Sequence, residues 1–224
     1  MAIFNTVYGG EWSWKPWANT VAYYPLTSTS TVNDMSWNWL TLTNNWNVLF
    51  WTYHWVDCAN YSGNWSLRNS VLTTWYIWQT FTISEWVLRH WNEILIWTFN
   101  NVGTKRAIWI NVASTFINFT FGTWSAFQDN KYSINTVTDQ WYHIALTHNS
   151  TGNLIWYVNW QQVITWNVTI WEWASNFWIW AAVFSDNEIY YSNWNISNVI
   201  IEDIPRTAQE ISKYYNQTKS LYWL

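Results

Sequence analysis

The sequence predicts an all-β protein, a two-sheet antiparallel jelly-roll sandwich with one short C-terminal helix. Short runs rich in β-branched and aromatic residues recur along the chain, separated by clusters of Asn, Ser, Thr and Gly or Trp. Short strands separated at regular intervals by turn-forming residues are typical of β-sandwiches and jelly rolls. A chain of 224 residues is also long enough for one large β domain. We therefore expect residues 20–224 to form one jelly-roll domain after an irregular lead-in at residues 1–19.

Nine runs are expected to be strands because Val, Ile, Tyr, Phe, Trp and Thr dominate them. They are 21–26, 80–90, 93–99, 106–112, 115–121, 131–137, 141–149, 154–160 and 197–203. Within 131–137, Tyr132, Ile134 and Thr136 alternate with the remaining side chains, which predicts one buried and one solvated face. The connection at 150–153 has hairpin length, so 141–149 and 154–160 should pair as antiparallel neighbours.

The single expected helix begins near Thr207. Thr207 and Glu210 have the spacing of a capping box, and Pro205 precedes them. Ala208, Ile211 and Tyr215 then share one face of the helix. We expect that face to lie on the sandwich.

Tryptophan recurs where turn chemistry favours glycine. In "LIWYVNWQQVI" (154–164), two strand-like runs leave Asn159 and Trp160 for the turn. A two-residue type I′ turn needs positive φ at both central positions, which Asn tolerates, Gly supplies freely and Trp supplies badly. The chain holds 26 Trp and only 6 Gly, whereas Gly is normally about 7% of a protein. Further turn-type tryptophans are Trp39, Trp65 and Trp194.

Two interpretations explain this composition. In the first, UGA codons, which some genetic codes read as Trp and others as Gly, stand as Trp in the sequence where the cell inserts Gly. Trp86 and Trp141 would then be genuine, because they lie in strand-like runs where an aromatic side chain packs well. In the second, the protein is truly Trp-rich and its indoles stack on sugars. The recoding interpretation predicts that Trp39, Trp65, Trp160 and Trp194 lie in turns, exposed, some with positive φ.

The net charge, the apolar runs and the N-terminal residues indicate which partners and which location to expect. A net charge of −4 with 9 Lys and Arg argues against nucleic acid, because phosphate binding needs clustered cations. We expect no membrane insertion, since no run approaches the ~18 apolar residues of a span, and no signal peptide is visible at the N-terminus. The lone Cys58 forms no intramolecular disulfide. An extracellular, virion or cell-surface location is expected, because a virion component needs no leader.

Several segments resemble one known family in order and spacing when turn-type Trp is taken as Gly. The segments are "VAYYPLTSTSTVNDMSWNWLTLTNNW" (21–46), "FTISEWVL" (81–88), "WYHIALTHNSTGNLIWYVNWQQV" (141–163) and "NWNISNVIIEDIPRTAQEISKYY" (193–215). Together they resemble concanavalin A-like lectin/glucanase domains of the laminin-G-like type over about residues 20–217. The resemblance implies a two-sheet jelly roll, a binding role and often a structural Ca²⁺.

The resemblance also indicates a calcium site. It places Asp34 and Asn38 in the family's Asp-x-Ser-Gly-Asn-Gly loop, and Asn198 at a closing-strand position where the family commonly has an acid. Loops rich in such oxygen ligands suit Ca²⁺, so we expect Asp34 to lie near Asn198. The alternative is that Asp34 and Asn38 form Asx turns.

Signals for catalysis are missing, so we expect no enzyme. The Glu-x-Asp-x-x-Glu spacing of glucanases is absent, and the chain's four His show no zinc-ligand spacing. His143 is expected to be a packed strand residue. The leading interpretation is a non-enzymatic glycan-binding or structural recognition module, a phage tail or fibre component or a surface adhesin. We expect carbohydrate or a cell-surface glycan as its partner, and a homo-oligomer in a larger assembly. The alternatives are a glucanase-like glycoside hydrolase and a purely architectural virion domain.

Overall fold

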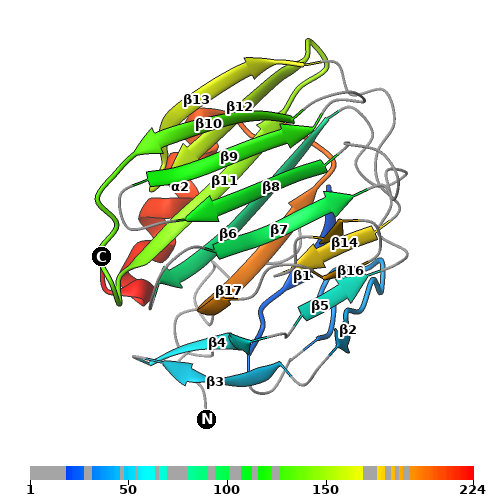
Figure 1. Ribbon diagram of the computed structural model, residues 1–224, viewed down its shortest axis with the longest axis vertical. Helices are drawn as coiled ribbons and strands as arrows, with labels where there is room; N and C mark the ends of the chain where they lie inside the picture. Colours follow the sequence, from blue (N-terminus) through cyan, green and yellow to red (C-terminus); the bar gives the residue numbers. More distant parts are fainter. Residues whose placement is uncertain are drawn as a thin grey trace.

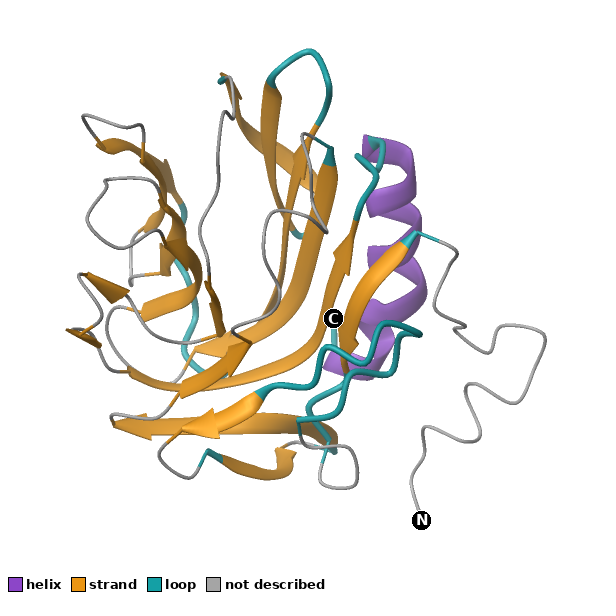
Figure 2. Ribbon diagram, turned by 90° about the vertical axis from the view of Figure 1, so that its right-hand side faces the viewer, coloured by secondary structure: helices purple, strands orange, loops and turns teal. Residues whose placement is uncertain are grey.

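The computed structural model describes most of the chain from residue 19 onward. The described residues are 19–27, 32–45, 48–53, 55–63, 66–69, 80–89, 94–100, 107–112, 116–122, 127–168, 176–179, 183–184, 187–188 and 192–224. They form two stacked layers of antiparallel strands with one helix against the outer side of one layer (Figures 1 and 2). Of the predicted lead-in at 1–19, residues 1–18 lie outside the described residues.

The larger sheet has eight strands and supports the helix. Its hydrogen-bonded order is β13 (Gln161–Asn167), β12 (Asn153–Val158), β11 (Trp141–His148), β6 (Phe81–Arg89), β17 (Ser192–Glu202), β4 (Val56–Gly63) and β3 (Leu49–Tyr53), with β1 (Thr20–Tyr24) also pairing to β17. Helix α2 (Ala208–Thr218) and the short 3₁₀ helix η1 (Lys219–Tyr222) follow β17 and end the chain.

The second sheet has seven strands. Its order is β10 (Phe127–Ser133), β9 (Phe116–Gly122), β8 (Ala107–Val112), β7 (Ile94–Asn100), β14 (Asn176–Ile179), β5 (Ser66–Asn69) and β2 (Thr43–Asn45). Strands β15 (Val183–Phe184) and β16 (Asn187–Glu188) pair with each other in a separate two-stranded antiparallel ribbon. The predicted two-sheet antiparallel sandwich is therefore the observed fold.

Strand β17 changes partner along one edge. Its first half pairs with β4 and its second half with β1, while β6 pairs along the other edge. The register shifts between Ser197 and Ile200, and Asn198 there has a φ of 53°. Such a bulge lets one strand serve two neighbours. The Asn198 backbone N–H is bonded to the Pro25 carbonyl at 3.3 Å instead of to the sheet ladder.

Alternation along the strands produces two separate cores. Inward side chains such as Ile83, Val87 and Ile144 join the main core between the sheets. Their sequence neighbours Trp86 and Leu88 point to the opposite side and pack with residues of α2 and η1. Because successive side chains point to opposite faces of a strand, the eight-stranded sheet is buried on both faces where the C-terminal segment covers it.

The predicted hairpin is confirmed. Strands β11 and β12 pair antiparallel, with Ile144 opposite Val158 and His148 opposite Leu154. The connection contains Gly152 at φ 84°, where an added Cβ would come within 2.9 Å of the Val168 carbonyl oxygen. Strand β12 then turns directly into β13 through Asn159 and Trp160.

Several expected strand ends differ from the observed ones, and the largest differences are in β10 and β17. Strand β10 ends at Ser133, although the alternation of exposure predicted over 131–137 continues through Thr136. Strand β17 begins five residues before the predicted 197. The prediction that Trp194 lies in a turn is therefore wrong: Trp194 is within β17, opposite Tyr61 and Arg89. The Asn residues around Trp194 favour a turn locally, but pairing with β4 and β6 holds this segment in a strand.

The C-terminal helix has the predicted cap and face. The Glu210 backbone N–H is bonded to the Thr207 hydroxyl, and the Thr207 backbone N–H donates to the Glu210 carboxylate at 2.8 Å. Ile211 and Tyr215 are buried against the sheet, whereas Ala208 is exposed. Reciprocal capping fixes where the chain leaves β17 and enters the helix.

Tryptophan occupies two contrasting settings. Trp86 and Trp141 are buried in strands, as predicted. Trp39 and Trp160 lie in turns or loops with φ values of 55° and 69° and are exposed, also as predicted. Trp65 lies outside the described residues. Eight described non-glycine residues have positive φ, and four of them are tryptophans: Trp39, Trp55, Trp160 and Trp223.

Candidate functional site

Asp34 organises the loop that follows β1. Its carboxylate accepts four hydrogen bonds, two at Oδ1 from the backbone N–H groups of Tyr23 and Ser36 and two at Oδ2 from the Ser36 hydroxyl and the Leu40 N–H. The Asp34 to Ser36 bond is the Asx turn that the sequence left as an alternative. Asp34 is buried, so these donors compensate the loss of water around the charge.

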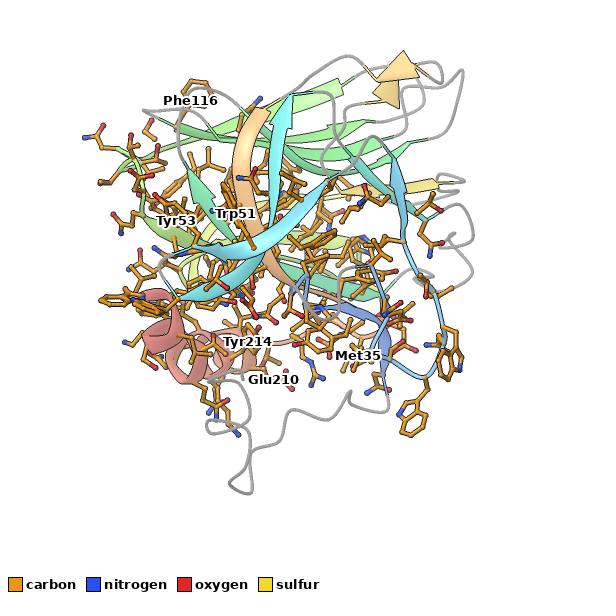
Figure 3. All side chains as sticks on the ribbon, turned by 90° about the horizontal axis from the view of Figure 1, so that it is seen from below. Met35, Trp51, Tyr53, Phe116, Glu210 and Tyr214 are labelled. Atoms are coloured by element: carbon orange, nitrogen blue, oxygen red, sulfur yellow. The ribbon has the colours of Figure 1, made fainter. Side chains whose placement is uncertain are left out.

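The same loop presents its apolar side chains to solvent. Asn38 is exposed, and its side-chain amide donates to the Val21 carbonyl at 2.9 Å. Met35, Trp37 and Trp39 point outward, with Trp37 and Trp39 80% and 81% exposed. Figure 3 labels Met35 of this loop, to the right of Glu210 on α2 in the view from below. The loop therefore has a hydrogen-bonded polar centre at Asp34 and exposed apolar side chains at its surface, which we call the exposed rim.

Tyr23 connects Asp34 to Asn198. Its backbone N–H donates to Asp34 Oδ1 and its phenol donates to Asn198 Oδ1, both within 2.9 Å. The Asn198 amide nitrogen in turn bonds the Tyr222 hydroxyl. The first loop and the closing strand are therefore joined as the sequence suggested, through a tyrosine that contacts both residues.

This arrangement does not fit a calcium ligand set. A carboxylate has about four lone-pair sites, and the four donors to Asp34 occupy them. Ca²⁺ needs six to eight oxygen ligands, yet the described residues contain no group of three or more His, Cys, Asp or Glu side chains able to hold a metal. Calcium binding through Asp34, Asn38 and Asn198 stays a prediction that metal titration must decide.

Acidic side chains near the C-terminal helix are engaged in structure. Arg206 contacts Glu202 at 2.7 Å and Glu210 at 2.9 Å. Burial raises the pKa of Glu202 above its ordinary value, while the adjacent Arg206 acts in the opposite direction. The three residues tie the end of β17 to the first turn of α2. Both carboxylates are thus bound to the same guanidinium.

His143 and Cys58 are buried and unreactive. Desolvation lowers the pKa of His143 to about 3, and burial raises the pKa of the Cys58 thiol to about 12. His143 packs against the rings of Trp86 and Tyr214, with centroids 5.1 and 5.3 Å away. His143 is thus the packed strand residue that the sequence predicted.

Sequence reasoning missed a polar and aromatic cluster on the outer face of the eight-stranded sheet. Trp86, Trp141, Asn195 and Ser197 lie on this face beneath η1, where Tyr222 is buried. The hydrophobic pattern marked Trp86 and Trp141 as core residues but gave no sign that Tyr222 would cover them. In the described part of the chain, no helix has the length and apolar composition needed to cross a bilayer.

Comparison with solved structures finds a similar β-sandwich in structures of botulinum neurotoxins. A structure of botulinum neurotoxin type C, whose cell entry depends on two ganglioside molecules, is 16% identical, with a TM-score of 0.67 over 91% of this chain. The binding domain of neurotoxin DC in complex with rat synaptotagmin II is 17% identical with a TM-score of 0.68, and the same domain in complex with SialylT is 18% identical with a TM-score of 0.69, each over 91% of this chain.

The likeness concerns fold and covers part of the matched chains. This chain spans 51% or 52% of each of those three chains. No protein-family model matches the sequence. No curated protein matches it either. The fold and the described residues define the class as an antiparallel, jelly-roll-like β-sandwich.

Proposed function

We propose that this chain is a non-enzymatic glycan-binding module displayed outside the cell. The observation that carries the proposal is the fold likeness over 91% of the chain to a neurotoxin type C whose cell entry depends on gangliosides, and to a neurotoxin binding domain that forms complexes with SialylT and with rat synaptotagmin II. Fold alone does not determine function. The proposal is therefore argued from the likeness together with the ion pairs of Glu202 and Glu210 with Arg206 and the complete burial of His143.

The finer identity that we propose is a phage tail or fibre component, or a surface adhesin, built on a concanavalin A-like domain of laminin-G-like type. The motif order in the sequence supports this assignment. Asn159 and Trp160 stand at the Asn and Gly of the hairpin that the resemblance implies, and both have positive φ. Assembly as a homo-oligomer on a particle belongs to the same proposal.

Recoding of UGA is part of the proposal. Four exposed tryptophans with positive φ stand where glycine is free of steric cost. Asn and Asp visit this region several-fold more often than other non-glycine residues, so Asp139, Asn159 and Asn198 are ordinary members of the set. Trp is a bulky residue for which this conformation is an outlier.

A glycan array tests the binding function. The chain is applied in two forms, as printed and with Gly at Trp39, Trp55, Trp160 and Trp223, to sialylated, ganglioside and neutral oligosaccharides. Binding by the glycine form is the expected result, because the folded scaffold and not the turn indoles is proposed to bind. Binding by the printed form alone would favour a Trp-rich sugar binder. Binding by neither form would leave the architectural virion domain as the better interpretation.

A further inference from the structure

Tyr222 occupies an aromatic site on the outer face of the eight-stranded sheet. Its ring lies parallel to Trp86, with centroids 4.0 Å apart and an interplanar angle of 10°, and it meets Trp141 edge-on at 5.0 Å. Tyr222 is 1% exposed although it lies two residues from the end of the printed chain. The site therefore holds a flat six-membered ring against an indole.

The hydroxyl of Tyr222 meets polar groups at one edge of this site. It donates to the Ser197 hydroxyl at 3.2 Å and accepts a hydrogen bond from the Asn198 amide nitrogen. Ser197 in turn donates to the Asp57 carbonyl at 3.0 Å. Ligand sites commonly combine an apolar contact surface with a few fixed polar groups. A pyranose ring would satisfy both features, with its C–H face on Trp86 and a hydroxyl in place of the phenol.

Further polar atoms surround the site without a hydrogen-bond partner among the described residues. They are Trp86 Nε1, Trp141 Nε1, Asn195 Nδ2 and both ring nitrogens of His143, all buried. The strand register brings them together: Ser197 lies opposite Trp86, which lies opposite His143, and Asn195 lies opposite Leu88, which lies opposite Trp141. Buried polar groups are usually bonded. A phenol has one hydroxyl to offer them, whereas a sugar has several.

The cover over the site is short. Helix η1 has four residues, and Trp223 and Leu224 beyond it are exposed. Runs of 3₁₀ helix are weakly bonded because their hydrogen-bond geometry is poor. Displacing η1 breaks the contacts of Tyr222 while α2 keeps its own capping box and its Arg206 ion pairs.

We propose that Trp86, Trp141, Ser197 and Asn198 form a pyranose-binding site and that Tyr222 occupies it as an internal stand-in until a sugar displaces η1. The inference rests on the proposed glycan-binding function. Trp86 and Trp141 belong to the genuine tryptophans in either interpretation of the composition, so the site does not depend on the turn-type Trp.

The test compares Tyr222→Ala with a control, Trp223→Gly. The control changes the exposed residue next to Tyr222 and leaves Tyr222 and η1 in place over the site. Both variants and the unchanged chain are titrated with each oligosaccharide retained on the array, using calorimetry. We expect Tyr222→Ala to bind about tenfold more tightly, because apparent affinity rises when the competent state is no longer rarely populated. Trp223→Gly should bind as the unchanged chain does, and adding Trp86→Ala to Tyr222→Ala should abolish the gain.

A second variant at Tyr222 keeps the test decisive in case Tyr222→Ala does not fold. Tyr222→Phe keeps the stacked ring and removes the two hydroxyl hydrogen bonds, so it should give a smaller rise in affinity. If the unchanged chain binds a glycan and no Tyr222 variant alters the affinity, the site assignment is wrong and the proposed function stands. If no form binds any glycan, both proposals fail.

Discussion

The tryptophans beneath η1 and those in the turns have opposite physical settings. Trp86 is 0% exposed and stacks between strand and helix residues, whereas Trp39 is 81% exposed with a φ of 55°. Burial of a large aromatic stabilises the fold, but a left-handed backbone costs a bulky residue roughly 1–2 kcal/mol. One residue type is favourable in the first setting and unfavourable in the second. The described tryptophans therefore occupy two distinct structural settings, and the proposal of UGA recoding assigns them to two populations.

The largest expected effect comes from removing a buried indole. Trp86→Ala should lower the free energy of unfolding by about 3–5 kcal/mol, the usual cost of a large aromatic truncated in a core. Trp37→Ala, in the exposed rim, should change it by less than about 0.5 kcal/mol. Chemical denaturation followed by circular dichroism measures both. Equal losses for the two variants would abolish the distinction between the settings.

Acid should weaken the same buried face. His143 has a folded pKa of about 3 because burial disfavours its charged form, and its unfolded pKa is about 6.5. The unfolded state therefore binds the proton first, so the stability is complete above pH 6.5 and falls as the pH drops toward 3. The loss attributable to this residue should reach about 2 kcal/mol at pH 5.

His143→Phe provides the control for this pH dependence. Phenylalanine fills a similar volume and carries no titrating group, so the difference in unfolding free energy between the two proteins should depend on pH below 6.5. Denaturation at a series of pH values gives this difference directly. A constant difference from pH 7 to pH 5 would show that His143 is not buried in its neutral form.

The loop of the exposed tryptophans depends on a polar centre instead of on its indoles. Asp34→Asn replaces one acceptor oxygen with a donor that faces other donors, so it should cost about 2 kcal/mol. The loss should be equal in calcium and in chelator, because the four donors of Asp34 belong to the protein. Thermal unfolding in both buffers measures it, and a calcium-dependent rise in Tm of the unchanged chain alone would instead support a metal site at Asp34, Asn38 and Asn198.

The smallest expected effect is a gain. Trp39→Gly and Trp160→Gly should each raise the free energy of unfolding by about 1 kcal/mol, because glycine has no steric penalty at positive φ. Trp37→Gly should show no such gain, since Trp37 is not among the residues with positive φ. Denaturant titration of the three single variants distinguishes backbone relief from loss of an exposed indole.

The sequence was sufficient to predict the sheets' general character but not their pairing. Period-two alternation and hairpin spacing predicted the antiparallel pair β11 and β12, and the Thr207 capping box predicted the start of α2. Strands β2 to β5 were not predicted, because Asn, Thr and Trp between residues 43 and 69 obscure the alternation. The bulge at Asn198, which lets β17 pair with β4 and then β1, depends on contacts between distant segments.

The candidate site shows the same limit. Local chemistry identified Asp34 as the centre of a polar loop and left open an Asx turn, which the structure contains. The stacking of Tyr222 on Trp86 joins residues 136 positions apart in the chain, as their numbers show. No periodic pattern within either segment records such a contact, so it could be found only once the chain was folded.

Peptide mass spectrometry of the protein isolated from its native source tests the two populations most directly. The account predicts glycine at positions 39, 55, 160 and 223 and tryptophan at 86 and 141, matched by UGA and UGG codons respectively. Tryptophan at all six positions would contradict it, and the exposed indoles would then have to be explained as a sugar-stacking surface.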